Sequence, residues 1–192
     1  NFKDGGILRD NQSNLFKSHI NKMLKSKIDL IITSGAVSAG KYDFVPSAVR
    51  NFQLSNYFKS VAIRPGKPIL FAKIKGKPKA VFGLPGNPIS SAACFRFFVY
   101  PYIRSLLGIK EEISFKARLR NEFRKKNDFT RFVKSKLSTT KNGKLEVEIL
   151  KGQESFRIKS FIQSNIWTSL PSGKSKFKKG KQGDLPAIST AS

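Results

Sequence analysis

The fold of the first half of this chain is decided by residues 29–40, DLIITSGAVSAG. The run from Asp29 to Thr33 is short and mostly apolar, which is typical of a strand covered on both faces. The residues before it, 14–25, place their apolar side chains on one side of a helix. A helix followed by such a strand predicts an α/β domain that contains part of a parallel sheet. The loop 34–40 then lies at the carboxyl end of a strand, where open α/β sheets bind ligands.

Two proline-glycine loops repeat this arrangement, RPGKP at residues 64–68 and LPGNP at residues 84–88. Each loop follows or ends an apolar run, and basic residues lie close to each of them. Backbone amides approach a phosphate closely only where side chains are absent, and fixed cations complete such a site. The three small-residue loops together predict a cradle for an anion.

The runs 61–63, 69–74 and 79–84 are further strand candidates, and KGKP at residues 75–78 is a plausible hairpin turn between the last two. Asn87 is placed to cap a helix that runs from Pro88 toward Leu107, kinks at Pro101 and ends at Gly108. Short β-type runs follow. They are Arg131–Leu137, Leu145–Leu150, Ser155–Ile158 and Ile166–Leu170.

These patterns predict three regions. Residues 1–110 form the α/β domain, residues 111–173 form a small β domain, and residues 174–192 form an irregular basic tail. The only cysteine, Cys94, suits a reducing compartment such as the cytoplasm, and with a single histidine it cannot build a His/Cys metal cluster. No apolar run approaches the roughly 20 residues that a membrane helix needs.

The formal net charge of +25 is the most extreme property of the composition. It fits nucleic-acid binding or a field that attracts anionic substrates. The lysines are dispersed through both halves, however, and many fall in turns, which favours solvated faces. We therefore expect any binding to nucleic acid to be non-specific.

The loops at 34–40, 64–68 and 84–88, with ILRDN at residues 7–11 and KYDF at residues 41–44, resemble those of the molybdopterin molybdotransferases, the MoeA proteins and the E domain of gephyrin. Weaker similarity extends to residues 153–155 and 165–171. The resemblance implies a three-layer molybdopterin-binding domain followed by a small all-β, barrel-like domain. It implies insertion of molybdate into adenylylated molybdopterin, with release of AMP, in molybdenum cofactor biosynthesis.

Site residues follow from the same resemblance. Asp10 and Asp43 match acidic positions near Mg²⁺ and the pyrophosphate, and are the expected catalytic and metal-binding residues. The structural alternatives are that Asp10 caps the first helix and that Asp43 shapes a turn. Mg²⁺ prefers carboxylate and phosphate oxygens as ligands, so the two carboxylates and the substrate's phosphates suit it. The expected substrate-binding residues are Ser34, Gly35, Ser38, Gly40, Lys59, Arg64, Lys67, Pro85, Gly86, Asn87, Pro88, Lys134 and Ser155.

Four positions depart from the family pattern. Ala36 replaces a glycine, Lys41 an acid, Lys134 an arginine and Glu154 a glycine. Lysine keeps the charge of arginine but loses its bidentate geometry. A carboxylate at Glu154 would repel an anionic ligand.

The family carries further domains and a first phosphate loop ahead of the match at Ile7, and its full-length members form homodimers in which a partner completes the cleft. The resemblance therefore predicts a fragment that retains affinity for a pterin phosphate without turnover. The alternatives are a molybdopterin adenylyltransferase, an inactive scaffold, or a basic nucleic-acid-binding module around Phe129, Phe132 and Lys134.

Overall fold

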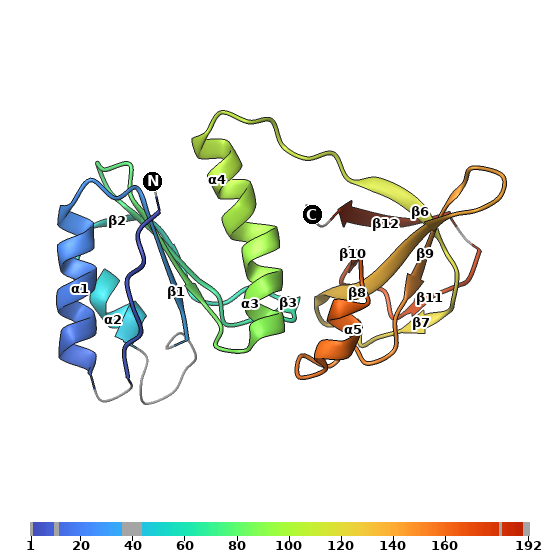
Figure 1. Ribbon diagram of the computed structural model, residues 1–192, viewed down its shortest axis with the longest axis horizontal. Coiled ribbons are helices and arrows are strands. Elements are labelled where there is room, and N and C mark those ends of the chain that lie inside the picture. The colour runs from blue at the N-terminus through green and yellow to red at the C-terminus, as the bar shows by residue number, and fades with distance from the viewer. Residues whose placement is uncertain (1, 10–11, 36–43, 181, 190–192) are drawn as a thin grey trace. The chain divides into compact units, whose positions relative to one another are not determined.

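The computed structural model describes residues 2–9, 12–35, 44–180 and 182–189, and Figure 1 shows its elements. The chain forms two compact units. The first comprises residues 1–61 and 68–86, and the second comprises residues 62–67 and 87–192. Residues 62–67 thus interrupt the first unit in sequence but fold with the second. The backbone passes from one unit to the other at three places.

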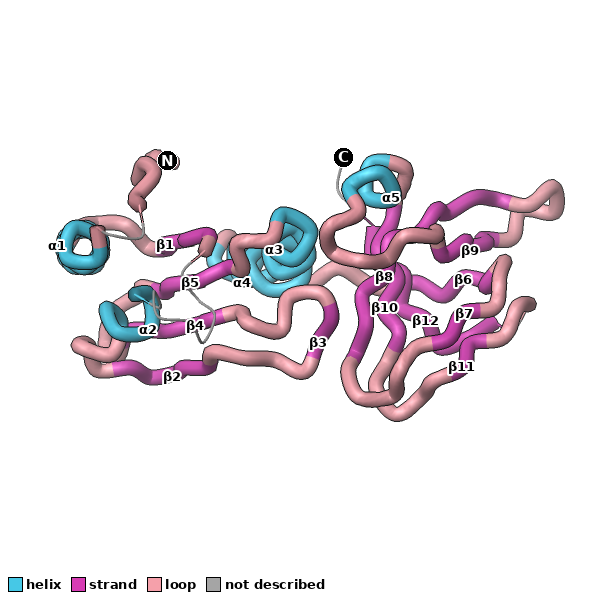
Figure 2. Tube along the Cα trace, turned by 90° about the horizontal axis from the view of Figure 1, so that it is seen from below, coloured by secondary structure: helices cyan, strands magenta, loops and turns pink. Residues whose placement is uncertain are grey.

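The first unit contains a four-stranded sheet in the order β1-β5-β4-β2. Its strands are β1 (Leu30–Ser34), β2 (Leu54–Phe58), β4 (Leu70–Ile74) and β5 (Ala80–Leu84). Figure 2 shows them side by side in this order. β1 and β5 are parallel, whereas β4 pairs antiparallel with both β5 and β2. The predicted parallel sheet is therefore a mixed one, because the short turn at Gly76 (φ +69°) can join β4 to β5 only as a hairpin.

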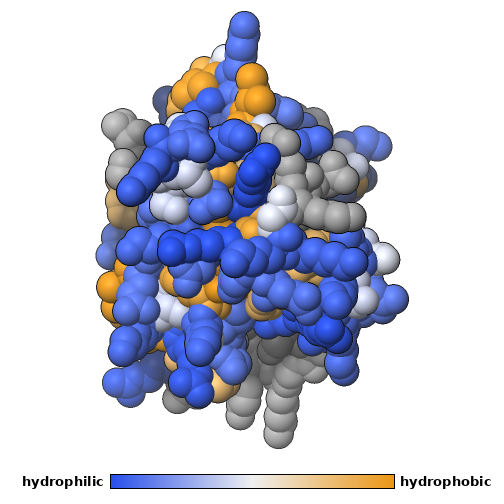
Figure 3. All heavy atoms as spheres, turned by 90° about the vertical axis from the view of Figure 1, so that its right-hand side faces the viewer, coloured by the Kyte–Doolittle hydropathy of each residue, from blue (hydrophilic) through white to orange (hydrophobic). Residues whose placement is uncertain are grey.

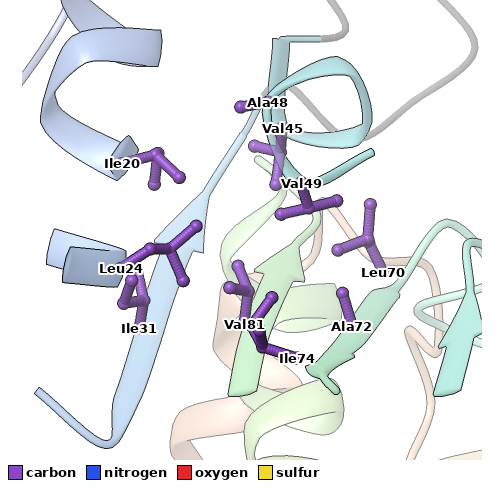
Figure 4. Close-up of a cluster of buried hydrophobic side chains, with 10 residues drawn as sticks. All are labelled: Ile20, Leu24, Ile31, Val45, Ala48, Val49, Leu70, Ala72, Ile74 and Val81. Atoms are coloured by element: carbon purple, nitrogen blue, oxygen red, sulfur yellow. The ribbon is translucent and has the colours of Figure 1, made fainter. Parts of the chain in front are cut away.

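Two helices supply the apolar layer of this unit, α1 (Ser13–Lys25) and α2 (Phe44–Val49). Ile20 and Leu24 lie one turn apart on α1 and are both 1% exposed. They share one core with residues from α2 and the sheet (Figure 4). The remaining members of that core are Ile31, Val45, Ala48, Val49, Leu70, Ala72, Ile74 and Val81. Both helices therefore cover the same face of the sheet.

The second unit begins its largest helical segment at Pro88, with α3 (Pro88–Cys94), a π-helical turn η1 (Phe95–Val99) and α4 (Tyr100–Leu106). The segment ends at Gly108 (φ +67°), as predicted. Pro101 lies at the start of α4 and has no N–H to donate. The preceding turn widens, so that the Tyr100 N–H bonds to the Phe95 carbonyl five residues back.

A six-stranded sheet carries the rest of the second unit, in the order β10-β12-β6-β9-β8-β3. Its strands are β3 (Ile63–Arg64), β6 (Phe115–Leu119), β8 (Thr130–Thr139), β9 (Leu145–Ile149), β10 (Ile166–Leu170) and β12 (Gln182–Ser189). β10 also pairs with β8, so five of these strands form a ring of pairings. β7 (Phe123–Arg124) and β11 (Lys176–Phe177) form a separate pair.

The core of this β structure lies among Val133, Val147, Ile166 and Leu170, all 1% exposed or less. Figure 3 shows the face of the molecule that lies to the right in Figure 1. Hydrophilic residues cover most of this face, and hydrophobic residues form small separate patches. The predicted fold class, an α/β part followed by a small β domain, is confirmed.

Two predictions about elements of the second unit are wrong. Residues 155–158, expected as a strand, form a turn that leads into α5 (Ile158–Ile162). The expected irregular tail contains β11 and β12, and β12 pairs with β10 and β6. Pro186 and a break in the register hide this strand from a search for alternating patterns.

The compact units divide the chain elsewhere than at residue 110. The helical segment 88–106 folds with the second unit, where Ile89 and Ala93 pack with Trp167 of β10. The predicted domain bounds and the third layer of the α/β domain stay predictions.

Candidate functional site

Two small-residue loops meet at one edge of the first unit's sheet. β1 and β5 are parallel neighbours, so the loops that follow them begin at the same edge. The Gly35 N–H donates to the Leu84 carbonyl at 2.9 Å, and the Ser34 hydroxyl donates to the Pro85 carbonyl at 3.3 Å. The two loops are thus joined at their first residues, as a shared cradle requires.

The two glycines add no side chain to this junction. Gly35 has φ +85°, a conformation that residues with a side chain rarely adopt, and a Cβ there would meet nothing within 4 Å. A Cβ on Gly86 would lie 3.7 Å from the Gly35 Cα. The backbones of the two loops therefore approach each other closely, beside space that no described residue fills.

Lys59 belongs to the same edge by topology. β2 is antiparallel to β4, which is antiparallel to β5, so β2 ends where β1 and β5 end. Lys59 follows β2 directly and is exposed. Because β4 lies between β5 and β2, two strand spacings of about 4.8 Å each separate β2 from β5. The structure thus places Ser34, Gly35, Lys59, Pro85 and Gly86 on one edge.

Four predicted site residues lie outside the described part of the chain. They are Asp10, Ser38, Gly40 and Asp43, and the substitutions Ala36 and Lys41 lie there too. Among the described residues no group of three or more His, Cys, Asp or Glu side chains converges as a metal site would. The Mg²⁺ site therefore stays a prediction that depends on Asp10 and Asp43.

In the second unit, Arg64 and Lys67 bracket the proline-glycine loop. Both are exposed, and both lie over the ring of Phe129, with the Arg64 Cζ 5.1 Å and the Lys67 Nζ 5.6 Å from its centroid. Arg64 Nη2 also contacts Asp128 Oδ2 at 3.2 Å. Phe129 therefore gathers the two loop cations at one place.

Gly66 and Cys94 hold the backbone of this loop. The Cys94 thiol lies 3.5 Å from the Gly66 carbonyl and donates to it. Gly66 has φ +100°, and a Cβ there would lie 2.4 Å from Cys94 Sγ. Burial raises the pKa of the thiol to about 12, so Cys94 is a protonated packing residue.

Asn87 and Pro88 begin α3 as the sequence predicts. The Asn87 side-chain oxygen accepts the Ser90 N–H at 3.1 Å, and Pro88 occupies the first turn. The capping interpretation of Asn87 is confirmed. A contact of either residue with substrate stays a prediction.

Lys134 has a structural role that the sequence does not suggest. Its side chain is buried, and its ammonium donates to the carbonyls of Gly152, Glu154 and Arg157 at 2.8, 3.1 and 3.1 Å. An ammonium has three donors, so none is left for an anion. Burial lowers the pKa of Lys134, and the nearby Arg131 charge acts in the same direction.

The loop that Lys134 holds carries Ser155, which is half-buried. The carboxylate of Glu154, expected to repel an anion, pairs instead with Arg157 at 3.4 Å on the surface. Lys134 therefore positions the loop of a predicted site residue and does not itself reach a ligand.

Sequence reasoning missed two basic residues beside Arg64. Arg131 of β8 and Lys125 line a hollow of about 140 Å³ together with Arg64, Lys126, Asp128 and Phe129. Arg131 lies two residues before the buried Val133 on β8, so the two residues share one face of the sheet. Charged residues are rarely found on a buried face, so a search for alternating patterns could have identified Arg131 as a candidate site residue.

Both parts of the chain match known protein families. Residues 1–105 match the sequence family described as "Probable molybdopterin binding domain", and residues 116–184 match the one described as "MoeA C-terminal region (domain IV)". The chain therefore belongs to the MoeA family, as its loops predict. None of the described helices is both long and apolar enough to cross a membrane.

Similar curated proteins are named molybdopterin molybdenumtransferase. One from Staphylococcus epidermidis is 34% identical over 183 residues, which cover 94% of this chain and 43% of that protein. One from Staphylococcus aureus strain COL is 34% identical over 167 residues, covering 85% and 39%. The chain thus spans about two fifths of the length of these relatives.

Solved structures share the fold. A molybdenum cofactor biosynthesis protein from Pyrococcus furiosus matches with a TM-score of 0.66 at 23% identity, covering 95% of this chain and 55% of that one. The molybdopterin biosynthesis moeA protein from Pyrococcus horikoshii matches with a TM-score of 0.68 at 22% identity, covering 97% and 41%.

Proposed function

We propose that this chain is the substrate-binding part of a molybdopterin molybdotransferase. It binds adenylylated molybdopterin and takes part in inserting molybdate, with release of AMP, in molybdenum cofactor biosynthesis. Relatives that are 34% identical over most of the chain are named for the transferase reaction, which favours this activity over adenylyl transfer.

The observation that carries the proposal is the junction of the two loops at the sheet edge. Gly35 and Gly86 bring bare backbone together where two parallel strands end, and their loops are tied by the Gly35–Leu84 and Ser34–Pro85 hydrogen bonds. Backbone of this kind suits a phosphate that must come close to main-chain amides. Lys59 adds a cation at the same edge.

The reaction needs positioning and charge more than acid–base chemistry. Arg64 and Lys67, fixed beside Phe129, supply cations that suit phosphate or molybdate oxygens. A magnesium ion held by Asp10 and Asp43 would neutralise charge on the phosphoanhydride. Cys94 and Lys134 take no chemical part in this proposal, because one is a buried thiol and the other is committed to three carbonyls.

The proposal is tested by binding of adenylylated molybdopterin to the chain, followed through pterin fluorescence, with a graded pair of variants. Gly86→Ala adds a Cβ in ordinary contact with Gly35, whereas Gly86→Val adds two methyl groups at the same junction. We expect wild type to bind, Gly86→Ala to bind slightly less well, and Gly86→Val to lose most of its affinity. Equal thermal stability of the three proteins would show that the loss is local.

Turnover is measured in the same preparation by adding molybdate and Mg²⁺ and following AMP release and activation of an apo-molybdoenzyme. Incubation with molybdopterin and Mg-ATP instead tests adenylyl transfer. Binding that fails in wild type, or adenylylation of molybdopterin, would contradict the proposal. In keeping with the predicted fragment, we expect binding without AMP release from this chain alone. Removal of the metal with EDTA should abolish any AMP release while leaving part of the affinity.

The proposal extends to the setting of the reaction. We infer a cytoplasmic protein, in keeping with its buried free thiol, and a homodimer when the transferase is full-length. Light scattering of the purified protein tests the oligomeric state directly.

A further inference from the structure

A two-stranded ribbon in the second unit turns an apolar pair inward and a cationic pair outward. β7 and β11 are antiparallel, and their register pairs are Phe123 with Phe177 and Arg124 with Lys176. Phe177 belongs to the core of the β structure, and Phe123 packs against that core. Since successive residues of a strand point to opposite sides, the Arg124 and Lys176 side chains face solvent, where they are 71% and 44% exposed.

A single carboxylate lies between these two cations. Glu122 Oε1 contacts Arg124 Nε at 3.0 Å, and Glu122 Oε2 contacts Lys176 Nζ at 3.6 Å. The hydrogen bond from Arg124, together with the charge of Lys176, holds the pKa of Glu122 below its ordinary value. Glu122 therefore offsets the repulsion between two like charges directly opposite one another in the ribbon. Both of its oxygens are engaged in doing so.

Three further lysines flank the outward pair. Lys174, Lys178 and Lys179 are all exposed, and within the described ranges of the chain none of them forms an ion pair. The two segments that build and flank the ribbon, residues 122–126 and 174–179, together contain seven basic residues and one acidic residue. The ribbon thus carries a dense excess of positive charge.

Neighbouring strands of the same unit balance their charges instead. On β6 and β9, Arg118 is the register partner of Glu146, and Arg120 Nη1 contacts Glu148 Oε2 at 3.5 Å. Cations and carboxylates therefore lie side by side on these two strands. The excess on the ribbon is local, and an evenly spread lysine-rich composition does not account for it.

The ribbon offers charge but no side chain to insert or to stack. The large apolar residues that are exposed in the described chain include none in residues 115–144 or 163–180. Hydrophilic residues cover most of the side on which β7 and β11 lie in Figure 1 (Figure 3). Amphipathic attachment to a bilayer needs apolar side chains beside the cations, and single-stranded nucleic acids stack their bases on aromatic rings. The ribbon therefore suits a partner that is held by charge alone.

We propose that the β7–β11 ribbon is a binding surface for the phosphodiester backbone of double-stranded nucleic acid. Duplex DNA carries one negative charge per about 1.7 Å of its axis, which matches a dense row of exposed cations. Contacts to phosphates carry no base information, so the binding is independent of sequence. The second unit builds this surface by itself, and the proposal stands whether or not the chain proves to be a transferase.

The salt dependence of duplex binding tests the surface. Fluorescence anisotropy of a short labelled DNA duplex, titrated with the full chain at several salt concentrations, gives the association constant. Its logarithm falls linearly with the logarithm of the salt concentration, by about 0.9 for each phosphate contact. A variant with Lys174→Gln, Lys178→Gln and Lys179→Gln loses three contacts, so its slope should be shallower than that of wild type by roughly two to three units.

The matched control is a variant with Lys17→Gln, Lys22→Gln and Lys25→Gln. These lysines are also exposed and lie together on α1, so the change of net charge is the same on a different element. The slope of the control should stay within about 0.9, one phosphate contact, of wild type. Equal changes of slope in the two triple variants would overturn the proposal, because binding would then follow net charge and not the ribbon.

Replacing the same three ribbon lysines by arginine keeps their charge and should restore the slope of wild type. Circular dichroism of each protein shows whether it is folded. An arginine variant that binds as weakly as the glutamine variant would contradict the proposal, since the loss would then not be one of charge. So would a clear preference of wild type for one duplex over another of scrambled sequence.

Other polyanions test the identity of the partner. Polyglutamate represents an acidic protein, and vesicles containing phosphatidylglycerol represent an anionic membrane. We expect both to bind more weakly than the duplex at the same salt concentration. Tighter binding of either one that is lost in the ribbon variant would overturn nucleic acid as the partner and would identify an acidic protein or a lipid surface in its place.

Discussion

Single residues hold the 64–68 loop in place, and Gly66 is the clearest case. Its positive φ and its closeness to Cys94 Sγ each exclude a side chain for a different reason. The first reason is a property of the backbone and the second is a property of packing. The two can be separated by experiment.

We expect Gly66→Ala to destabilise the protein by more than the roughly 1–2 kcal/mol that a left-handed conformation costs a residue with a Cβ. Gly143→Ala is the control, because Gly143 has φ +72° and open space around it. Urea unfolding measures both variants. The difference between them reports the clash with Cys94.

A double-mutant cycle with Cys94→Ala then isolates the contact. Removing the sulfur should relieve the clash that Gly66→Ala creates. The double variant should therefore lose less unfolding free energy than the two single variants lose in sum. Additivity within about 0.3–0.5 kcal/mol would mean that the residues do not interact.

Lys134 is the second residue whose surroundings define its role. Lys134→Met keeps most of the side chain but removes the donor for three carbonyls, and each buried polar group left unpaired costs about 1–3 kcal/mol. We expect a loss of roughly 2 kcal/mol or more of unfolding free energy. Lys136→Met, an exposed change on the same strand, should stay within about 0.5 kcal/mol of wild type.

Equal effects of the two lysine changes would contradict the structural role of Lys134. The sequence predicts Lys134 as a substrate-binding residue, whereas in the structure its ammonium holds a loop. Its carbonyl partners lie 18 to 23 residues along the chain, and no local pattern predicts that a loop will close over it.

Among the elements, α3 follows its sequence most closely. Asn87, Pro88 and Gly108 set its start and the end of the helical segment, as predicted, because capping and left-handed positions depend on the residue type itself. Strands that depend on distant partners are harder to predict from the sequence. β12 is defined by pairing with β6 and β10, which its own sequence does not reveal. The strand expected at residues 61–63 is observed as β3, Ile63–Arg64, where it pairs with β8.

The cap of α3 allows the structural and binding roles of Asn87 to be separated. Asn87→Asp keeps an oxygen for the Ser90 N–H, so stability should change little, whereas Asn87→Ala should cost about 1 kcal/mol. If Asn87 also contacts an anionic substrate, Asn87→Asp should weaken binding of adenylylated molybdopterin more than Asn87→Ala does. The reverse order would leave Asn87 with capping alone.

For the molecule as a whole, the net charge of +25 makes non-specific attraction to polyanions unavoidable. We expect the chain to bind a single-stranded oligonucleotide of any sequence at low salt, with an affinity that falls steeply and is largely lost by about 0.2 M salt. Fluorescence anisotropy over a salt series measures this. A sequence-selective complex that survives such salt would favour the nucleic-acid-binding alternative over the transferase.

The path of the backbone between the two units has a consequence for dissecting the protein. Because residues 62–67 fold with the second unit while lying between two parts of the first, three peptide connections join the units. A single proteolytic cut at any one of them leaves the units covalently attached. Expression of residues 87–192 alone would leave β8 without its β3 neighbour and remove Arg64 from beside Arg131. Neither unit can therefore be produced whole from one continuous segment of this chain, because each has residues on both sides of a stretch that belongs to the other.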